Sequence, residues 1–172
     1  MKIVMLCVVS SLLVPHSAWA QHVHGSSPYT DFMSREIKAI SVEQMEEYLS
    51  GKGMGLALAA ELNGYPGPLH VLEHADVLGL DAGQLEAVTA LRDSMQHEAI
   101  ALGRTIVQQE RALDRAFRDG SIDETRLAGL TSEIGDLQGS VRDVHLRAHL
   151  VVKELLSAEQ LEHYQRLRGY VQ

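Results

Sequence analysis

Two long amphipathic segments between Asp81 and Leu155 constrain the fold of this chain more than any other feature. Apolar residues recur in them at alternating spacings of three and four, which places them on one stripe of a helix. The second segment has the clearer stripe, formed by Leu127, Leu130, Ile134, Leu137, Val141, Val144, Ala148, Val151 and Leu155. The first is less regular and is formed by Leu85, Val88, Met95, Ala99, Leu102, Ile106, Leu113 and Ala116. The pattern predicts two long helices with coiled-coil-like packing.

Residues 118–121 (Arg-Asp-Gly-Ser) interrupt the apolar pattern, and Ser121 with Glu124 has the capping-box form that begins a helix. Helices joined by such a short break are usually antiparallel neighbours. An arm of ~35 residues is roughly 50 Å long at about 1.5 Å per residue. We therefore expect residues 81–155 to form an elongated antiparallel helical hairpin rather than a compact bundle.

Shorter helices are predicted on both sides of the hairpin. Capping-box patterns begin helices at Ser41, at Asp81 and at Ser157. The predicted short helices are residues 41–49, 54–62, 69–78 and 157–168. Aromatic residues make up only 5% of the chain and no strand-like alternation is sustained, so the fold class is all-α. We expect a single helical domain over residues 41–172, preceded by a flexible tail over residues 21–40.

The first twenty residues resemble an export signal. Lys2 precedes an apolar run from Ile3 to Val14, and Ala18-Trp19-Ala20 fits a signal-peptidase site. The alternative, an uncleaved membrane anchor, is disfavoured because the run is short for a bilayer span and ends in a cleavage pattern. Cleavage after Ala20 removes Cys7, the single cysteine, so the exported chain needs no disulfide and has no thiolate chemistry.

The exported chain is acidic. Loss of Lys2 leaves 14 basic against 23 acidic residues, a formal charge of −9, where the whole chain has −8. This charge argues against general nucleic-acid binding and is compatible with attracting cations. No Ser–His–Asp order, phosphate loop or organic-cofactor motif is present, so we do not expect an enzyme.

Two pairs of histidines are candidate metal ligands. His70 with His74, and His145 with His149, are four residues apart on predicted helices, a spacing that lets two imidazoles reach one ion. A turn near Gly120 would place the second pair near the open end of the hairpin, where the 69–78 helix joins. The alternative is solvated surface histidines, because such pairs cost a helix little.

The same register places His145 level with Gln96 and His149 level with Arg92. The helical phase places His145 beside the apolar seam and His149 further outward, with Asp93 on the solvent side. His22 and His24 in the tail form another pair, which we interpret as polar tail residues because a flexible pair is not a preorganised site.

A line of basic residues on the first arm is a candidate client-binding surface. Arg104, Arg111 and Arg118 recur every seven residues and so share one helix face. Glu110 and Asp114 interrupt the line. We therefore favour an ordinary solvated helix face, with client binding as the alternative.

Two short motifs carry a resemblance to a known family. Residues 80–84 (Leu-Asp-Ala-Gly-Gln) and 156–160 (Leu-Ser-Ala-Glu-Gln) resemble the paired LTxxQ motifs of the periplasmic Spy/CpxP family, and residues 40–44 form a weaker third copy. Residues 61–73 and 164–170 are similar to the heavy-metal sensor branch, which includes CnrX-like proteins. The resemblance covers roughly residues 55–170.

The resemblance implies a dimeric, cradle-like antiparallel helical protein of the periplasm with a stress-related role. It implies either a sensor of metal that restrains a membrane-bound regulator, or an ATP-independent chaperone for unfolded clients. In CnrX-like proteins the metal is held by His-x-x-x-His, a carboxylate in the next helix and His-x-x-x-Met.

Transferred to this chain, the resemblance implies a site formed by His70, His74, His145 and His149, with Asp93 nearest to the carboxylate position. His149 replaces the family's methionine, and the second pair lies about one turn further upstream than expected. Nickel, cobalt, zinc and copper are all candidate ions, since each accepts imidazole.

Overall fold

The computed structural model describes residues 27–171. The predicted signal peptide, its cleavage after Ala20, His22 and His24 lie outside the described residues. The chain divides into two units, Met1–Thr30 and Asp31–Gln172. The described end of the first unit is a turn in which Thr30 N donates to Ser27 O. The second unit contains every α-helix described below.

Residues 27–171 form helices and no strands, as the all-α prediction required. A short 3-10 helix, η1, spans Thr30–Ser34. The α-helices are α1 Val42–Ser50, α2 Leu58–Glu61, α3 Pro68–Glu73, α4 Ala75–Leu78, α5 Ala82–Arg118, α6 Glu124–Leu155 and α7 Ala158–Leu167. None of the described helices is long and apolar enough to cross a membrane.

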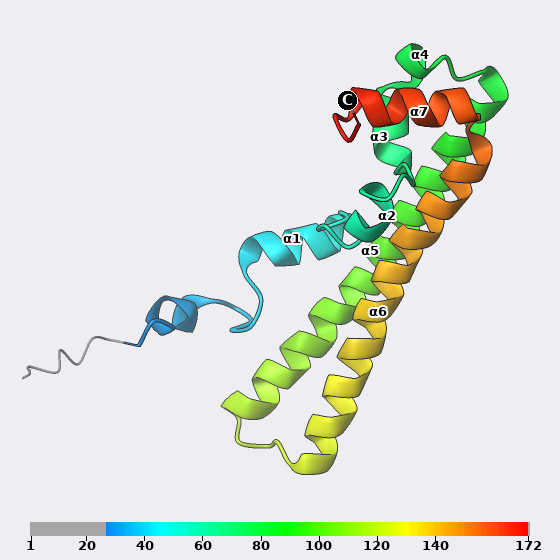
Figure 1. Cartoon of the computed structure of the whole chain (residues 1–172). Helices are drawn as coiled ribbons and strands as arrows, with labels where there is room; N and C mark the ends of the chain where they lie inside the picture. The colour runs from blue at the N-terminus through cyan, green and yellow to red at the C-terminus, as the bar shows by residue number, and fades with distance from the viewer. Residues whose placement is uncertain (1–26, 172) are drawn as a thin grey trace, which may run out of the picture. The chain divides into compact units, whose positions relative to one another are not determined.

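The two predicted long helices are α5 and α6, of 37 and 32 residues, which lie side by side and are joined by a short turn (Figure 1). The apolar stripes form the contact between them. Their buried members are Val88, Ala99, Ile106, Ala116, Ile134, Val141, Val144 and Ala148. Polar contacts flank this seam: Gln109 donates to Glu133 at 2.8 Å. Near the other end of the pair, Gln84 donates to the carbonyl oxygen of Leu155 at 2.8 Å.

Three of the predicted capping boxes are confirmed, because Ser41, Asp81 and Ser157 each accept a hydrogen bond from the backbone three residues later. The predicted box at Ser121 is wrong. Ser121 N donates to Ala116 O and thereby closes the end of α5, with Gly120 in the left-handed conformation. Asp123 instead caps α6 by accepting from Arg126 N.

The two glutamines that end the LTxxQ-like motifs are in contact. The side-chain amides of Gln84 and Gln160 hydrogen-bond each other at 2.9 Å. Gln160 also donates to Gly79 O at 3.3 Å. Below them lies the main core cluster, which consists of Val71, Leu78, Val88, Val152, Leu156 and Tyr164. These contacts hold α7 beside α3 and α4 at the end of the long pair.

Residues 35–40, which the sequence analysis assigned to the tail, pack against α5. Ile37 and Ile40 are buried in a cluster with Val107. Glu36 forms an ion pair with Arg111 at 2.7 Å, and Lys38 N donates to Asp114 at 3.0 Å.

Gly103 lets the end of α1 approach α5 closely. A Cβ at residue 103 would lie 2.2 Å from the carbonyl oxygen of Tyr48. No side chain fits in that space, so a glycine at residue 103 is what allows the end of α1 to lie against α5.

The segment between α1 and α5 differs from the prediction in two places. The predicted helix 69–78 is broken at His74, whose φ of −114° and ψ of 16° separate α3 from α4. His70 and His74 therefore do not lie on one continuous helix. The predicted helix 54–62 is shortened to Leu58–Glu61, because residues 54 and 55 both take a positive φ, which an α-helix excludes.

Candidate metal centre

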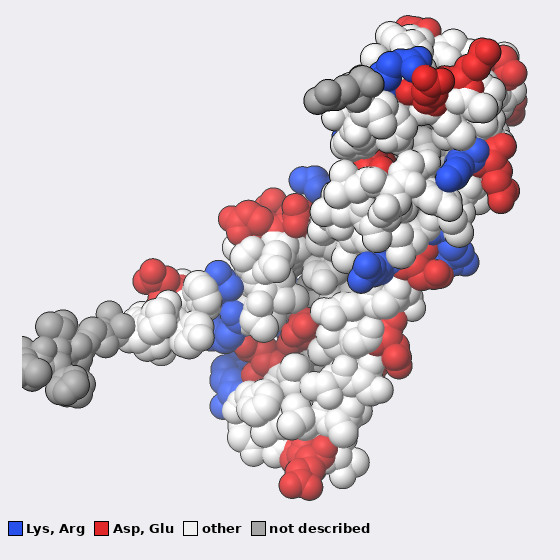
Figure 2. Space-filling model, viewed as in Figure 1, with Lys and Arg blue, Asp and Glu red and all other residues white. Residues whose placement is uncertain are grey.

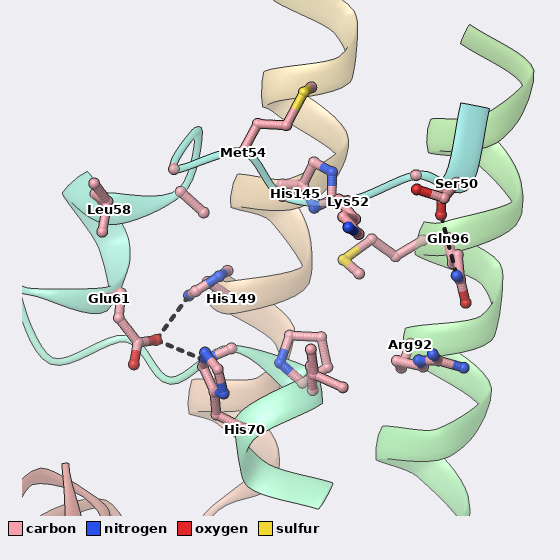
Figure 3. A pocket seen from close by; sticks show the side chains of 18 residues that line it. Ser50, Lys52, Met54, Leu58, Glu61, His70, Arg92, Gln96, His145 and His149 are labelled. Atoms are coloured by element: carbon pink, nitrogen blue, oxygen red, sulfur yellow. Dashed lines mark hydrogen bonds and ion pairs between the residues drawn. The ribbon is translucent and has the colours of Figure 1, made fainter. Parts of the chain in front are cut away.

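A cavity of about 430 Å³ lies where the segment 50–70 covers α5 and α6 (Figure 3). The long helices contribute Arg92, Met95 and Gln96 from α5, and His145 and His149 from α6. Gln96 and Arg92, which the sequence placed level with His145 and His149, line the same cavity as these two histidines. The covering segment contributes Lys52, Met54, Glu61 and His70 among others.

His145 is a buried, neutral imidazole with an unused nitrogen. Its exposed fraction is 4%, and its Nε2 has no hydrogen-bond partner within residues 27–171. Burial lowers the pKa of His145, and the neighbouring His149 lowers it further. An unpaired buried polar atom costs free energy, so a partner for this nitrogen would stabilise the protein.

His149 is also buried, with an exposed fraction of 8%, so the predicted outward position is wrong. The physical reason is the turn at residues 65–67, which folds over the ring. His149 Nδ1 lies 2.7 Å from the carbonyl oxygen of Tyr65. A carbonyl oxygen only accepts hydrogen bonds, so Nδ1 carries the proton and Nε2 of the neutral ring keeps its lone pair. Metal-binding histidines are commonly held in this way.

Gly67 makes room for the His149 ring. A Cβ at residue 67 would lie 2.9 Å from Cε1 and 3.0 Å from Nε2 of His149. The ring therefore stacks directly on the backbone of this turn. A side chain at this position would displace either the imidazole or the turn.

Glu61 supports the other side of the turn and was missed by the sequence analysis. Its carboxylate is 6% exposed, accepts from Gly67 N at 3.0 Å and lies 3.8 Å from His149 Nδ1. It also accepts from the phenol groups of Tyr164 at 2.5 Å and Tyr170 at 3.1 Å. Burial, and then the contact with Glu61, raise the pKa of the Tyr164 phenol, which stays protonated as a donor.

The other predicted ligands lie in different surroundings. His70 lines the cavity, and its Nδ1 donates to Glu73 at 2.9 Å, which lowers the pKa of Glu73. His74 occupies the break between α3 and α4 and does not line the cavity. Asp93 is exposed and pairs with Arg92 at 3.0 Å.

The structure thus brings His70, His145 and His149 to one cavity, and leaves His74 and Asp93 outside its lining. Within residues 27–171, no group of three His, Cys, Asp or Glu side chains is arranged closely enough to hold a metal ion. A metal at this cavity therefore needs either movement of the covering segment or ligands of another chemical type.

The candidate client-binding arginines are partly engaged with acidic neighbours. Arg111 pairs with Glu36 at 2.7 Å, and Arg118 lies 3.5 Å from both Asp114 and Asp119. Arg104 is exposed. On the face shown in Figure 2, basic and acidic groups alternate and no broad basic area is present.

Comparison with protein-family models, with curated proteins and with solved structures found no match to this chain.

Proposed function

We propose that this chain is a metal-binding protein of the bacterial periplasm, of the Spy/CpxP type, that takes part in metal sensing or metal resistance. The observation that carries the proposal is the pair formed by His145 and His149. Both imidazoles are buried on one face of α6 and line one cavity. Buried polar groups need partners, and one shared ion would supply a partner to both rings.

The two histidines have the properties that a metal ligand requires. Metal ions bind the neutral imidazole, and the lowered pKa of His145 keeps that ring neutral near pH 7. The contact between His149 and Tyr65 fixes the ring orientation before any ion arrives. Coordination would also satisfy the unpaired Nε2 of His145.

His70 is the third proposed ligand, because it lines the cavity from the short helix α3. His74 and Asp93 would join only after rearrangement, of the α3–α4 break for His74 and of the Arg92 ion pair for Asp93. Movement of this covering segment on binding is the proposed signal, since ligand binding shifts a conformational equilibrium by its differential affinity for the two states. Nickel, cobalt, zinc and copper remain the candidate ions.

The finer architecture is part of the same proposal. We take α5 and α6 as an antiparallel hairpin, which the contacts Gln109–Glu133 and Gln84–Leu155 support. We further propose that two copies form a cradle, since Leu58, Leu62 and Leu69 are exposed apolar side chains on the covering segment. Light scattering at micromolar concentration should give the mass of a dimer, and a stable folded monomer would contradict this part. The proposed output is contact with a membrane-bound regulator.

The second candidate is an ATP-independent chaperone for unfolded proteins. Exposed apolar residues favour it, and Leu150 and Val151 add to those on the covering segment. Against it, the proposed basic line is interrupted by ion pairs. We therefore rank metal binding first.

Calorimetric titration of the mature chain with each of the four ions tests the metal proposal. We expect one ion per chain to bind tightly and to release heat. The variant H145A/H149A should show no such heat of binding. The variant H97A removes an exposed histidine of α5 and should bind like the unmodified chain. Absence of binding by all four ions, or equal binding by H145A/H149A, would overturn the proposal.

A further inference from the structure

We infer that the cavity takes a soft monovalent d¹⁰ cation, copper(I), through the imidazoles of His145 and His149 and the thioethers of Met54 and Met95. This inference rests on the proposed function and names the class of ion for the same site. Four side chains suffice for the tetrahedral or lower coordination of such an ion, so His70, the third ligand proposed above for a divalent ion, is not required here.

The chemical types lining the cavity fit a soft ion. Met54 comes from the covering segment and Met95 from α5, and both line the cavity with the two histidines. Thioether sulfur is a soft, polarisable donor that favours copper(I), whereas hard divalent ions favour carboxylates and water. Glu61 is the single carboxylate among the lining residues of this cavity.

Glu61 is already committed to other partners. It accepts from Gly67 N, Tyr164 and Tyr170 and lies on the Nδ1 side of His149, away from the nitrogen that keeps the lone pair. To serve as a metal ligand, Glu61 would have to abandon several of these hydrogen bonds in a buried place. The thioethers of Met54 and Met95, by contrast, carry no charge.

Positive charge at the cavity also favours the lower ionic charge. Lys52 and Arg92 both line it, Arg92 being paired with Asp93 at 3.0 Å and Glu61 being engaged by the hydrogen bonds described above. Repulsion from a fixed positive charge grows in proportion to the charge of the ion, so a monovalent ion pays half the cost of a divalent one. The nearby positive charge favours a monovalent ion, and the thioether ligands favour a soft ion. Copper(I) is both.

The backbone at Met54 takes an unusual conformation beside the cavity. Its φ is 46°, and within residues 27–171 it is the one non-glycine residue with a positive φ. The strain is held between Gly53 and Gly55, and a Cβ at Gly53 would lie 3.9 Å from His145 Nδ1. Strained residues of this type cluster at ligand clamps and active sites.

Figure 3 shows Met54 beside the cavity with its sulfur directed away from both imidazoles. Ligation by Met54 therefore requires rotation about its side-chain bonds. The backbone places Met54 at the cavity. Methionine has three rotatable side-chain bonds and adopts many rotamers readily, so we expect the side chain to turn inward on binding.

The test compares silver(I), a redox-stable probe of the same charge and softness, with zinc(II) in the mature chain. The variant M54L/M95L keeps apolar volume and removes both sulfurs, and M33L/M45L is the matched control at methionines outside the cavity. We expect M54L/M95L to lose silver(I) affinity by about tenfold or more and to keep its zinc(II) affinity within about twofold. M33L/M45L should change neither affinity. Melts in the presence of a chelator verify that each variant folds.

A spectroscopic readout completes the experiment. In selenomethionine-labelled protein loaded with copper(I) without oxygen, selenium absorption spectra should show a copper neighbour, and that signal should vanish in M54L/M95L. Unchanged silver(I) affinity in M54L/M95L, or no copper neighbour at selenium, would overturn the inference. If zinc(II) still binds through His145 and His149 in that case, the proposed function stands without it. If no ion binds at all, the proposed function fails as well.

Discussion

His149 Nδ1 lies 2.7 Å from the carbonyl oxygen of Tyr65, so a residue of α6 is oriented by a turn that precedes it by 84 positions in the chain. The proton on Nδ1 directs the lone pair of the neutral ring to Nε2. The orientation of the His149 ring in the proposed site therefore depends on the fold of residues 61–67 as well as on α6.

Substitution of Gly67 by Ala should disturb this arrangement. The added Cβ would meet the His149 ring at 2.9 to 3.0 Å, and forced overpacking typically costs about 1–3 kcal/mol. We expect a lower free energy of unfolding by urea and a metal affinity lower by about tenfold or more. Gly129 is the matched control, because a Cβ at that position in α6 meets nothing within 4 Å. G129A should stabilise the helix by up to about 1 kcal/mol. Equal stability of G67A and the unmodified chain would contradict the packing described here.

The buried carboxylate of Glu61 should be energetically coupled to Tyr164. E61Q removes the charge that accepts from two phenol groups and from Gly67 N, and we expect a loss of about 1–3 kcal/mol in the free energy of unfolding. The variants E61Q, Y164F and E61Q/Y164F form a double-mutant cycle measured in urea. A coupling energy of about 0.5 kcal/mol or more is expected for groups in contact. Additive effects would show that the contact contributes nothing. E86Q, at an exposed position, should change stability little.

The lowered pKa of His145 predicts a pH dependence of stability. The unfolded chain takes up this proton near pH 6.5, whereas the folded protein takes it up only at lower pH. Between the two pKa values the unfolded state binds more protons, so stability falls as the pH falls through this window and levels off below the folded-state pKa. The slope from one proton is at most about 1.4 kcal/mol per pH unit.

Urea unfolding between pH 7.5 and pH 5 measures this slope in the chain without metal. H145Q should flatten it relative to the unmodified chain. H97Q, at an exposed position, should leave it unchanged. Lys52, Arg92 and His149 also line the cavity and remain in both variants, so the difference isolates His145. Identical profiles for H145Q and H97Q would contradict the burial of a neutral imidazole.

The chaperone alternative makes a separate prediction. If it holds, the purified chain suppresses the aggregation of an unrelated unfolding protein without ATP, and the change of Arg104, Arg111 and Arg118 to Ser weakens that suppression. Light scattering during thermal aggregation of the client measures it, with R142S on α6 as the control. No suppression at an equimolar amount of the chain would exclude this alternative and leave metal binding.

Local sequence signals were sufficient for most of the fold. The capping boxes at Ser41, Asp81 and Ser157 begin α1, α5 and α7 because side chain and backbone satisfy each other within one turn. The apolar stripes predicted which faces of α5 and α6 meet, because spacings of three and four residues place side chains on one side of a helix. The break at His74 has no glycine or proline to mark it, so a pattern of apolar spacing could not reveal it.

The site was only partly predictable. The one-turn spacing of His145 and His149 on one helix is a local pattern, and both line one cavity. Their burial does not follow from that pattern, because it depends on the segment 50–70 folding over α6. Glu61 was missed for a related reason: its partners Tyr164 and Tyr170 are more than 100 positions away, at separations of 103 and 109. No local pattern joins residues at that distance.

The most direct test of the account is a thermal melt of the mature chain with and without metal. A ligand that binds only the folded chain stabilises it by about 2.7 kcal/mol at a hundredfold excess over the dissociation constant. We predict that nickel, cobalt, zinc or copper raises the melting temperature relative to chelator. H145A/H149A should abolish this rise, and H70A/H74A should reduce it through His70. H22A/H24A should leave it intact. A rise that persists in H145A/H149A and disappears in H22A/H24A, or no rise with any ion, would contradict the metal centre proposed between α5 and α6.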